Sequence, residues 1–317
     1  MSSPGQNTAG VLWDPVVLAR IRRLHLQAVQ VVDGLMHGTH RSRRVGSNIE
    51  FADYKEYSPG DALRDVDWRV YARSDRLVTR RYEVETELSC TIVLDASADL
   101  STGDSSRFRL PELEGTKMGH ALTLAACLAW FLHKHQEPVG LVVLGGQGEQ
   151  PYVPPRGGGT HIARLFGALA SLRPGGQANL GAALATLGPR LRRRSLVVLI
   201  SDFMEEPALW VPSLSALARR RTDIVGFHLM DRRELALDYE RPALFYSPEG
   251  GDALPVDPVG ALGEFKAVRS QWLQEVRGGF STYQGRYYPA WTHLPLEQAL
   301  GNMIAGRRAL PQDEVAL

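Results

Sequence analysis

The stretch LSCTIVLDASAD (residues 88–99) decides the fold, because it begins as an apolar run and ends in polar residues. Three later runs have the same character: VGLVVLGG (139–146), SLVVLISD (195–202) and TDIVGFHLM (222–230). Apolar segments of helical length and period separate them. Strands that are apolar throughout are buried on both faces, and a strand–helix–strand order is typical of parallel crossovers. The sequence therefore predicts a doubly wound, mostly parallel α/β sheet.

The chain around this stretch divides into three predicted parts. Residues 1–85 are expected to form an N-terminal part, in which an amphipathic helix (residues 14–37) precedes a small strand-and-loop subdomain. Residues 86–306 are expected to hold the sheet, with a hairpin insertion at residues 242–257. Residues 307–317 are expected to be a frayed tail.

The charge balance argues against a protein whose surface is built for nucleic acid. The chain has 317 residues, with 36 Lys and Arg against 35 Asp and Glu. Basic runs occur at residues 40–44, 190–195 and 219–221. The last two lie at predicted helix ends, where cations interact favourably with the helix dipole. We expect no nucleic-acid partner; binding through these runs would show a steep salt dependence.

The longest apolar run, ALTLAACLAWFL (residues 121–132), is shorter than the roughly 20 residues that a membrane-spanning helix needs. A buried core helix explains it better. The first residues do not show a basic region followed by an apolar region, as a secretory signal would. We therefore expect a cytoplasmic protein with no membrane partner.

Acidic and hydroxyl side chains follow two of the predicted strands. Asp95, Ser97 and Asp99 follow the first, and Ser201 and Asp202 follow a later one. Ligands bind in doubly wound sheets at the carboxyl ends of strands, where the strand order reverses. If the two strands are neighbours, these oxygens form a candidate site for Mg²⁺ or a similar cation. Alternatively, the aspartates cap the turns or helices that follow, and spacing leaves both interpretations open.

Two motifs resemble those of known families. Asp95 and Ser97 form an Asp-x-Ser motif that looks like the metal-ion-dependent adhesion site of von Willebrand factor A domains. The pattern EF…Y…YSPGDALRDVDW…AR…L…Y..E, within residues 50–85, resembles the signature of the bacterial family catalogued as domain of unknown function fifty-eight (DUF58). The resemblance extends from about residue 35 through the last predicted helix. It implies a von Willebrand A-like domain, a MoxR-type AAA+ ATPase as partner, and an assembly or chaperone-like role.

The chain departs from the adhesion-site pattern of these families. Asp99 stands where a second Ser is typical; in the upstream signature, Ala62 stands where the second Asp of a Gly-Asp-Asp turn is typical. In GGQANLGAAL, Ala178 and Asn179 replace a Thr and an Asp. By the resemblance, the metal ligands that remain are Asp95, Ser97, Asp99 and Asp202. Because a hard divalent cation needs about six oxygens, we expect a degenerate site with weak Mg²⁺ binding, which Ala178→Thr strengthens.

The charged residues of the upstream signature have a structural explanation. Asp61, Arg64, Asp67 and Arg73 flank Trp68. Arg–carboxylate pairs around a buried aromatic ring would satisfy each of these charges. A Ser-His-Asp, His-Glu-x-x-His or Cys-His pattern is not recognisable there. We therefore expect a brace with Trp68 buried, and not a catalytic segment.

Two functions compete for the strand-end residues. In the first, the chain is a non-enzymatic interaction module whose loops bind a protein. Its interaction face would consist of Ser97, Asp99, Asn179 and Asp202. In the second, the chain is a phosphohydrolase that uses Mg²⁺ held by Asp95, Asp99 and Asp202. Against the second, Ser97 occupies the second position of the usual Asp-x-Asp nucleophile pair.

Overall fold

The computed structural model describes residues 15–39, 51–58, 66–82, 88–102, 116–148, 151–236 and 241–306. The chain forms two compact units, one of residues 1–37 and 88–317 and the other of residues 38–87. We call the first the sheet unit and the second the small unit, and each is described by itself.

The sheet unit is built on a central sheet whose strands lie in the order β10-β7-β6-β3-β4-β5. The strands are β3 (Cys90–Ala96), β4 (Val139–Gly145), β5 (Tyr152–Arg156), β6 (Leu196–Ser201), β7 (Asp223–Met230) and β10 (Arg286–Trp291). Neighbouring strands pair in parallel, except that β5 runs antiparallel to β4 at one edge. The predicted doubly wound, mostly parallel sheet is confirmed.

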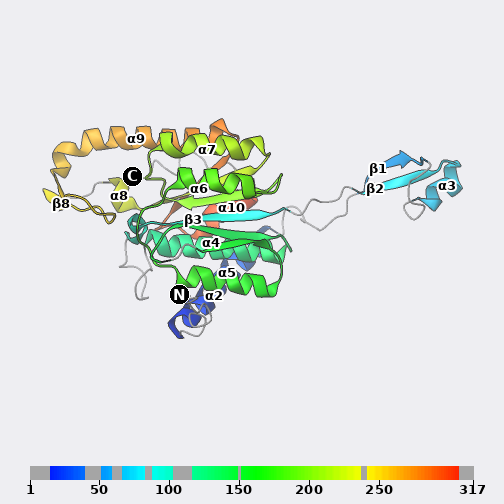
Figure 1. The fold of residues 1–317 in the computed structure, drawn as a ribbon, viewed down its shortest axis with the longest axis horizontal. Helices are drawn as coiled ribbons and strands as arrows, with labels where there is room; N and C mark the ends of the chain where they lie inside the picture. The colour runs from blue at the N-terminus through cyan, green and yellow to red at the C-terminus, as the bar shows by residue number, and fades with distance from the viewer. Residues whose placement is uncertain are drawn as a thin grey trace, which may run out of the picture. The chain divides into compact units, whose positions relative to one another are not determined.

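Helices cover both faces of this sheet (Figure 1). One face is covered by α2 (Pro15–Thr39), α4 (Lys117–Lys134), α5 (Gly159–Ser171) and α10 (Leu296–Ile304). The other face is covered by α6 (Leu180–Leu187), α7 (Pro207–Arg219) and α9 (Pro258–Thr282). Short helical turns η2 (Ala98–Ser101), η4 (Gly188–Arg190) and α8 (Arg232–Ala236) complete the connections.

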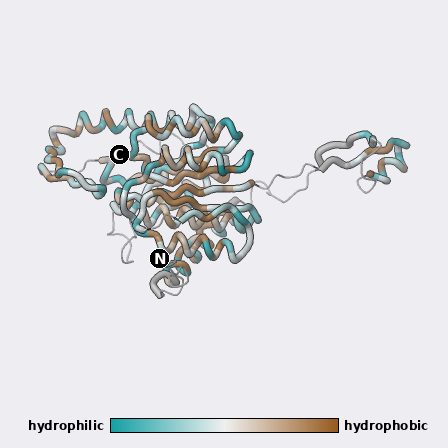
Figure 2. The backbone as a smooth tube through the Cα atoms, in the orientation of Figure 1, coloured by the Kyte–Doolittle hydropathy of each residue, from teal (hydrophilic) through white to brown (hydrophobic). Residues whose placement is uncertain are grey.

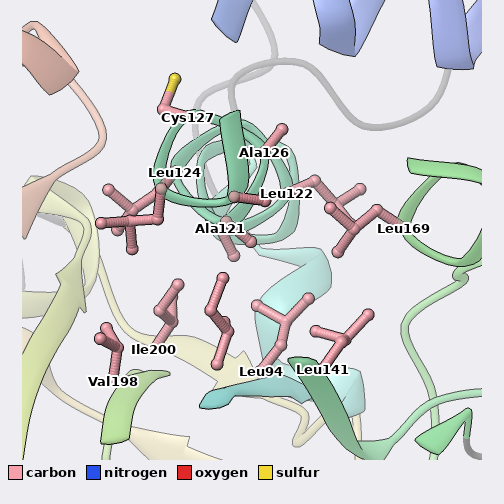
Figure 3. Close-up of a cluster of buried hydrophobic side chains, with 14 of the residues drawn as sticks. Leu94, Ala121, Leu122, Leu124, Ala126, Cys127, Leu141, Leu169, Val198 and Ile200 are labelled. Atoms are coloured by element: carbon pink, nitrogen blue, oxygen red, sulfur yellow. The ribbon is translucent and has the colours of Figure 1, made fainter. Parts of the chain in front are cut away.

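Strand β3 is buried along its whole length, and its side chains divide between the two layers. Ile92 and Leu94 belong to the apolar cluster under α4, whereas Val93 belongs to the cluster under α6 and α7. Figure 3 shows Leu94 and Ile200 on the sheet side of Ala121 of α4. The strands are the most hydrophobic part of the unit (Figure 2). A continuous apolar strand is therefore explained by burial on both sides.

Helix α2 packs within the sheet unit. Leu24, Ala28 and Val32 are buried in the same cluster as α4. Their spacing of four residues places them on one helix face, which needs an apolar partner. The expectation of one N-terminal part over residues 1–85 therefore differs from the structure, which assigns residues 1–37 to the sheet unit.

The long apolar run, residues 121–132, lies in α4, and most of its side chains are buried in the core, as expected for an internal helix. Within the described ranges, no helix combines the length and the apolar character that crossing a membrane would require.

The small unit contains β1 (Phe51–Glu56) paired antiparallel with β2 (Val78–Tyr82), and the helix α3 (Trp68–Ser74). Asp67 caps α3 by accepting hydrogen bonds from the N–H groups of Arg69 (3.0 Å) and Val70 (3.3 Å). Asp67 is buried at this position, at the N-terminal end of α3.

The structure contradicts the expectation that Trp68 is buried inside a brace of charged residues. Trp68 is 57% exposed, with its ring 6.2 Å from that of Tyr71, and Arg73 is exposed as well. Helix α3 has seven residues and none of them is buried, so it offers no interior for a large ring. Asp61 and Arg64 lie outside the described residues.

The predicted hairpin insertion is present as β8 (Ala243–Phe245) paired antiparallel with β9 (Leu254–Val256). Leu244, Tyr246 and Leu254 expose more than half of their surface there. The hairpin therefore presents apolar side chains to solvent.

The exposure of Trp68 predicts that its removal has little effect on stability. We expect Trp68→Ala to change the free energy of unfolding by no more than about 1 kcal/mol. Trp210→Ala, in the core, should cost about 3–5 kcal/mol, because Trp210 is fully buried against Phe203 and Phe280. Hydrogen exchange in β1 and β2 reports on the first variant, and urea unfolding followed by circular dichroism reports on the second. A marked loss of protection in Trp68→Ala would contradict the exposed position.

A second prediction concerns the packing of α9 on β7. A Cβ atom at Gly226 would lie 2.2 Å from the ring of Phe280, which is fully buried. Gly226→Ala should therefore destabilise the protein by about 1–3 kcal/mol. In Gly278→Ala, on the same helix as Phe280, the new Cβ meets no atom within 4 Å, so this control should be neutral or slightly stabilising. Equal unfolding midpoints for the two variants would contradict this packing.

Candidate functional site

The candidate site lies where β3 and β6 end. These strands are parallel neighbours, with Leu94 opposite Ile200, so the residues that follow them share one edge of the sheet. The chain runs from β3 to β4 on one side and later returns to β6 on the other, so the strand order reverses here. The predicted neighbourhood of the two acidic strand ends is present in the structure.

Asp95 joins the two strand ends through hydrogen bonds to both of its carboxylate oxygens. Oδ1 accepts from the N–H of Ser97 at 2.8 Å, and Oδ2 accepts from the Ser201 hydroxyl at 2.6 Å. The Ser201 oxygen in turn accepts from the N–H of Phe203 at 3.0 Å. Asp95 therefore holds both loops in place from a buried position.

The pKa of Asp95 is raised to about 7: burial is the largest cause, the Asp202 carboxylate acts in the same direction, and the hydrogen bonds from Ser201 and Ser97 act in the opposite direction. Two buried carboxylates this close need a positive charge nearby.

Lys117 supplies that charge. Its Nζ donates to Asp202 Oδ2 at 2.7 Å and lies 3.0 Å from Glu234 Oε2. The lysine side chain is 2% exposed, the Asp202 side chain 5% and the Glu234 side chain 37%. Burial acts to lower the pKa of Lys117, but the two carboxylates outweigh it, so this pKa is raised and the ammonium stays charged. The Thr102 hydroxyl contacts the other oxygen of Glu234.

Sequence reasoning missed Lys117 and Glu234, although Lys117 carried a signal. It is the first residue of α4, where the helix dipole disfavours a cation, and the rest of that helix is largely apolar. A lysine in such a place needs a carboxylate partner, and the structure supplies two. Glu234, in the short helix α8, gave no comparable signal.

The remaining predicted residues differ in how accessible they are. Ser97 is buried, whereas Asp99, in η2, is partly buried. Burial and the Asp202 carboxylate raise the pKa of Asp99, and Lys117 opposes this. Asn179 is exposed and caps α6, because its Oδ1 accepts from the N–H of Ala182 at 2.8 Å. Asn179 therefore supports a helix end, a role that was not predicted for it from the sequence.

Two further residues lie at the start of α6: Ala178, in the loop before the helix, and Glu205, in the loop after β6. Ala178 packs partly buried against the apolar cluster under α6 and α7, and it offers no side-chain oxygen. The backbone N–H of Leu180 donates to Glu205 Oε2 at 2.6 Å, so a carboxylate supports the same helix end as the Asn179 amide. These contacts are structural.

The rim of the site includes the turn of the hairpin insertion. Burial raises the pKa of Glu249, and the carboxylates of Asp99 and Asp202 raise it further, so this turn lies within electrostatic reach of the site. Met204, two residues after Asp202, is 60% exposed. The accessible part of the edge therefore combines acidic groups with an apolar side chain.

His228, in β7, lies beside the site but cannot act as its base. It is fully buried, with Nδ1 2.7 Å from the Tyr287 hydroxyl. Burial is the main cause that lowers its pKa to about 3, so the imidazole is neutral at physiological pH and has no contact with solvent.

The residues present do not fit a divalent cation of the adhesion-site type. Both oxygens of Asp95 accept internal hydrogen bonds, and Asp202 is paired with the Lys117 ammonium. Over the described part of the chain, no group of three or more His, Cys, Asp or Glu side chains is placed to hold a metal. A hard cation needs about six oxygens, and a neighbouring ammonium repels it.

Known proteins resemble this chain without assigning it a function. Uncharacterized proteins of Mycobacterium bovis and Mycobacterium tuberculosis are each 28% identical over 251 residues, which cover 78% of this chain and 76% of theirs. Among solved structures, BatB from Bacteroides thetaiotaomicron matches with a TM-score of 0.43 and 13% identity, covering 69% of this chain and 98% of its own. The SpRpn10 VWA domain matches with a TM-score of 0.38 and 14% identity, covering 70% and 98%.

The family model described as "Protein of unknown function DUF58" matches residues 53–275. This match spans more than half of the sequence and includes both strand ends of the candidate site. The chain therefore belongs to the DUF58 family.

Proposed function

We propose that this chain is a non-enzymatic protein-interaction module that binds its partner through the loops at the carboxyl edge of the sheet. The observation that supports this is the internal pairing of the buried polar groups. Asp95 accepts from Ser97 and Ser201, and Asp202 is paired with Lys117. Groups paired in this way fix the loops, and their oxygens are already engaged by internal contacts. Loops held by a rigid sheet are suited to recognition.

Not every residue of the expected interaction face is accessible to a partner. Ser97 and Asp202 were expected to belong to it, but both are buried and cannot touch a partner directly. Asp99 is partly buried, Asn179 is exposed, and Met204 is 60% exposed. In the proposal these three side chains contact the partner, with Met204 as an apolar anchor and the buried pair as support.

The partner that we propose is a MoxR-type AAA+ ATPase, in an assembly or chaperone-like role. The support comes from family membership, because DUF58 proteins commonly occur beside such ATPases. The geometry is compatible with a partner that presents basic groups, since Asp99 and Glu249 place carboxylates near the rim.

The enzymatic alternative, a Mg²⁺-dependent phosphohydrolase that uses Asp95, Asp99 and Asp202, has less support. The oxygens of Asp95 are engaged, and an ammonium is bound to Asp202. His228 is fully buried and its pKa is lowered to about 3, so its imidazole is a weak proton acceptor out of reach of solvent and a poor general base. Turnover of a phosphate ester that depends on Mg²⁺ and is lost in Asp202→Asn would favour this alternative.

Charge reversal on the face should weaken binding of the partner. We expect Asp99→Lys to raise the Kd for the MoxR-type ATPase of the same organism about tenfold or more, because it reverses a charge at the proposed contact. Met204→Glu should act in the same direction by removing the apolar anchor. Binding is measured by surface plasmon resonance with the purified full-length chain.

Arg193→Glu is the matched control, because it reverses one exposed charge. Arg193 lies on the loop before β6, at the amino end of that strand, whereas Met204 lies after its carboxyl end. Its Kd should stay at the wild-type value. Normal affinity in both Asp99→Lys and Met204→Glu would place the contact elsewhere, and failure of the ATPase to bind the wild-type chain would refute the proposed partner.

A further inference from the structure

Lys117 belongs to the polar cluster at the sheet edge, and the contacts of its ammonium and of its backbone N–H come from three separate connections. Asp202 follows β6, Glu234 follows β7, and the carbonyl of Thr102, after η2, accepts from the Lys117 backbone N–H at 3.0 Å. One residue at the start of α4 therefore links the loops that follow three neighbouring strands.

From this arrangement we infer that Lys117 is the permanent cation of the site and takes the place of a divalent metal. The inference goes beyond the proposed interaction function and does not depend on any partner. It makes the site one whose positive charge is covalently part of the chain, with Asp202 and Glu234 as its carboxylate partners.

The burial of Lys117 argues for this role over an incidental ion pair. Lys117 lies among the fully buried large side chains of the protein. An ammonium at this depth is tolerated only when carboxylates compensate it, and a surface pair would need no such burial. The lysine also lies at a helix N-terminus, where the helix dipole opposes it, so the two carboxylates must offset both penalties.

Lys117 and a metal compete for the same oxygens. The Nζ atom lies 2.7 Å from Asp202 Oδ2, an oxygen of one of the strand-end carboxylates. A metal bound there would face a positive charge within a few ångströms. At the opposite side of the site, Ala178 presents a methyl group that packs into the apolar cluster. The site therefore has its cation already and lacks the oxygens for another.

The first test is titration of the wild-type, full-length protein with MgCl₂ and with MnCl₂ by isothermal calorimetry. In place of the weak Mg²⁺ binding expected from the sequence, we now expect no saturable binding at millimolar concentrations, and the same Tm in EDTA as in MgCl₂. Saturable binding near one ion per chain that Asp202→Asn abolishes would overturn the inference. This result can be told apart from failure of the proposed function, because no partner takes part.

The second test removes the ammonium by Lys117→Met, which keeps most of the side-chain volume. We expect the Tm to fall by about 5–15 °C, because two carboxylates lose their counter-ion in a buried place. Lys134→Met, at the last turn of the same helix, is the matched control; Lys134 is exposed, and its Tm should change by no more than about 1–2 °C. Equal Tm values for the two variants would overturn the inference.

A double variant keeps the test decisive if Lys117→Met folds poorly. Lys117→Met with Asp202→Asn removes the uncompensated carboxylate together with the ammonium. Its Tm should lie above that of Lys117→Met alone, since the two losses are coupled through one contact. Losses that simply add in the double variant would show that the two groups do not act as a pair, and the inference would fail.

Discussion

Strand β3 lies between β4 and β6 with both faces buried, and this placement constrains the rest of the sheet unit. Because β3 has no exposed residue, helices must cover it on both sides, and α4 and α6 do so from opposite faces. Because the chain leaves β3 toward β4 and returns on the other side at β6, the carboxyl ends of β3 and β6 lie together where the order reverses. The buried carboxylates follow from that topology.

Much of this arrangement could be predicted from local patterns. Continuous apolar runs predict two-sided strands because burial on both faces leaves no place for alternate polar residues, and β3, β6 and β7 follow that rule. The meeting of Asp95 with Ser201 and Asp202 follows once the two strands are neighbours. The caps at Asp67 and Asn179 also follow from residue type, since short polar side chains before a helix satisfy its free N–H groups.

The features that sequence reasoning did not predict depend on contacts between distant residues. The burial of Lys117 requires Asp202 and Glu234, which come from other connections; Asp202 stood out as a strand-end residue, but no sequence pattern pairs it with Lys117 or marks Glu234. The assignment of α2 depends on which unit offers an apolar surface, and only the sheet unit buries Leu24 and Val32. Trp68 was misjudged because its neighbouring charges suggested an enclosing network, whereas α3 has no buried residue.

The origin of the cation also affects how the protein folds. Lys117 and Asp202 are 85 residues apart in sequence, and Asp95 and Ser201 are 106 residues apart, so both contacts close long loops at a cost in chain entropy. A metal ion could neutralise the strand-end carboxylates as soon as β3 and β6 pair. An ammonium carried by α4 arrives only when that helix docks. Intermediates in which the sheet has formed without α4 would hold uncompensated negative charge, so helix docking and completion of the sheet edge become one cooperative step.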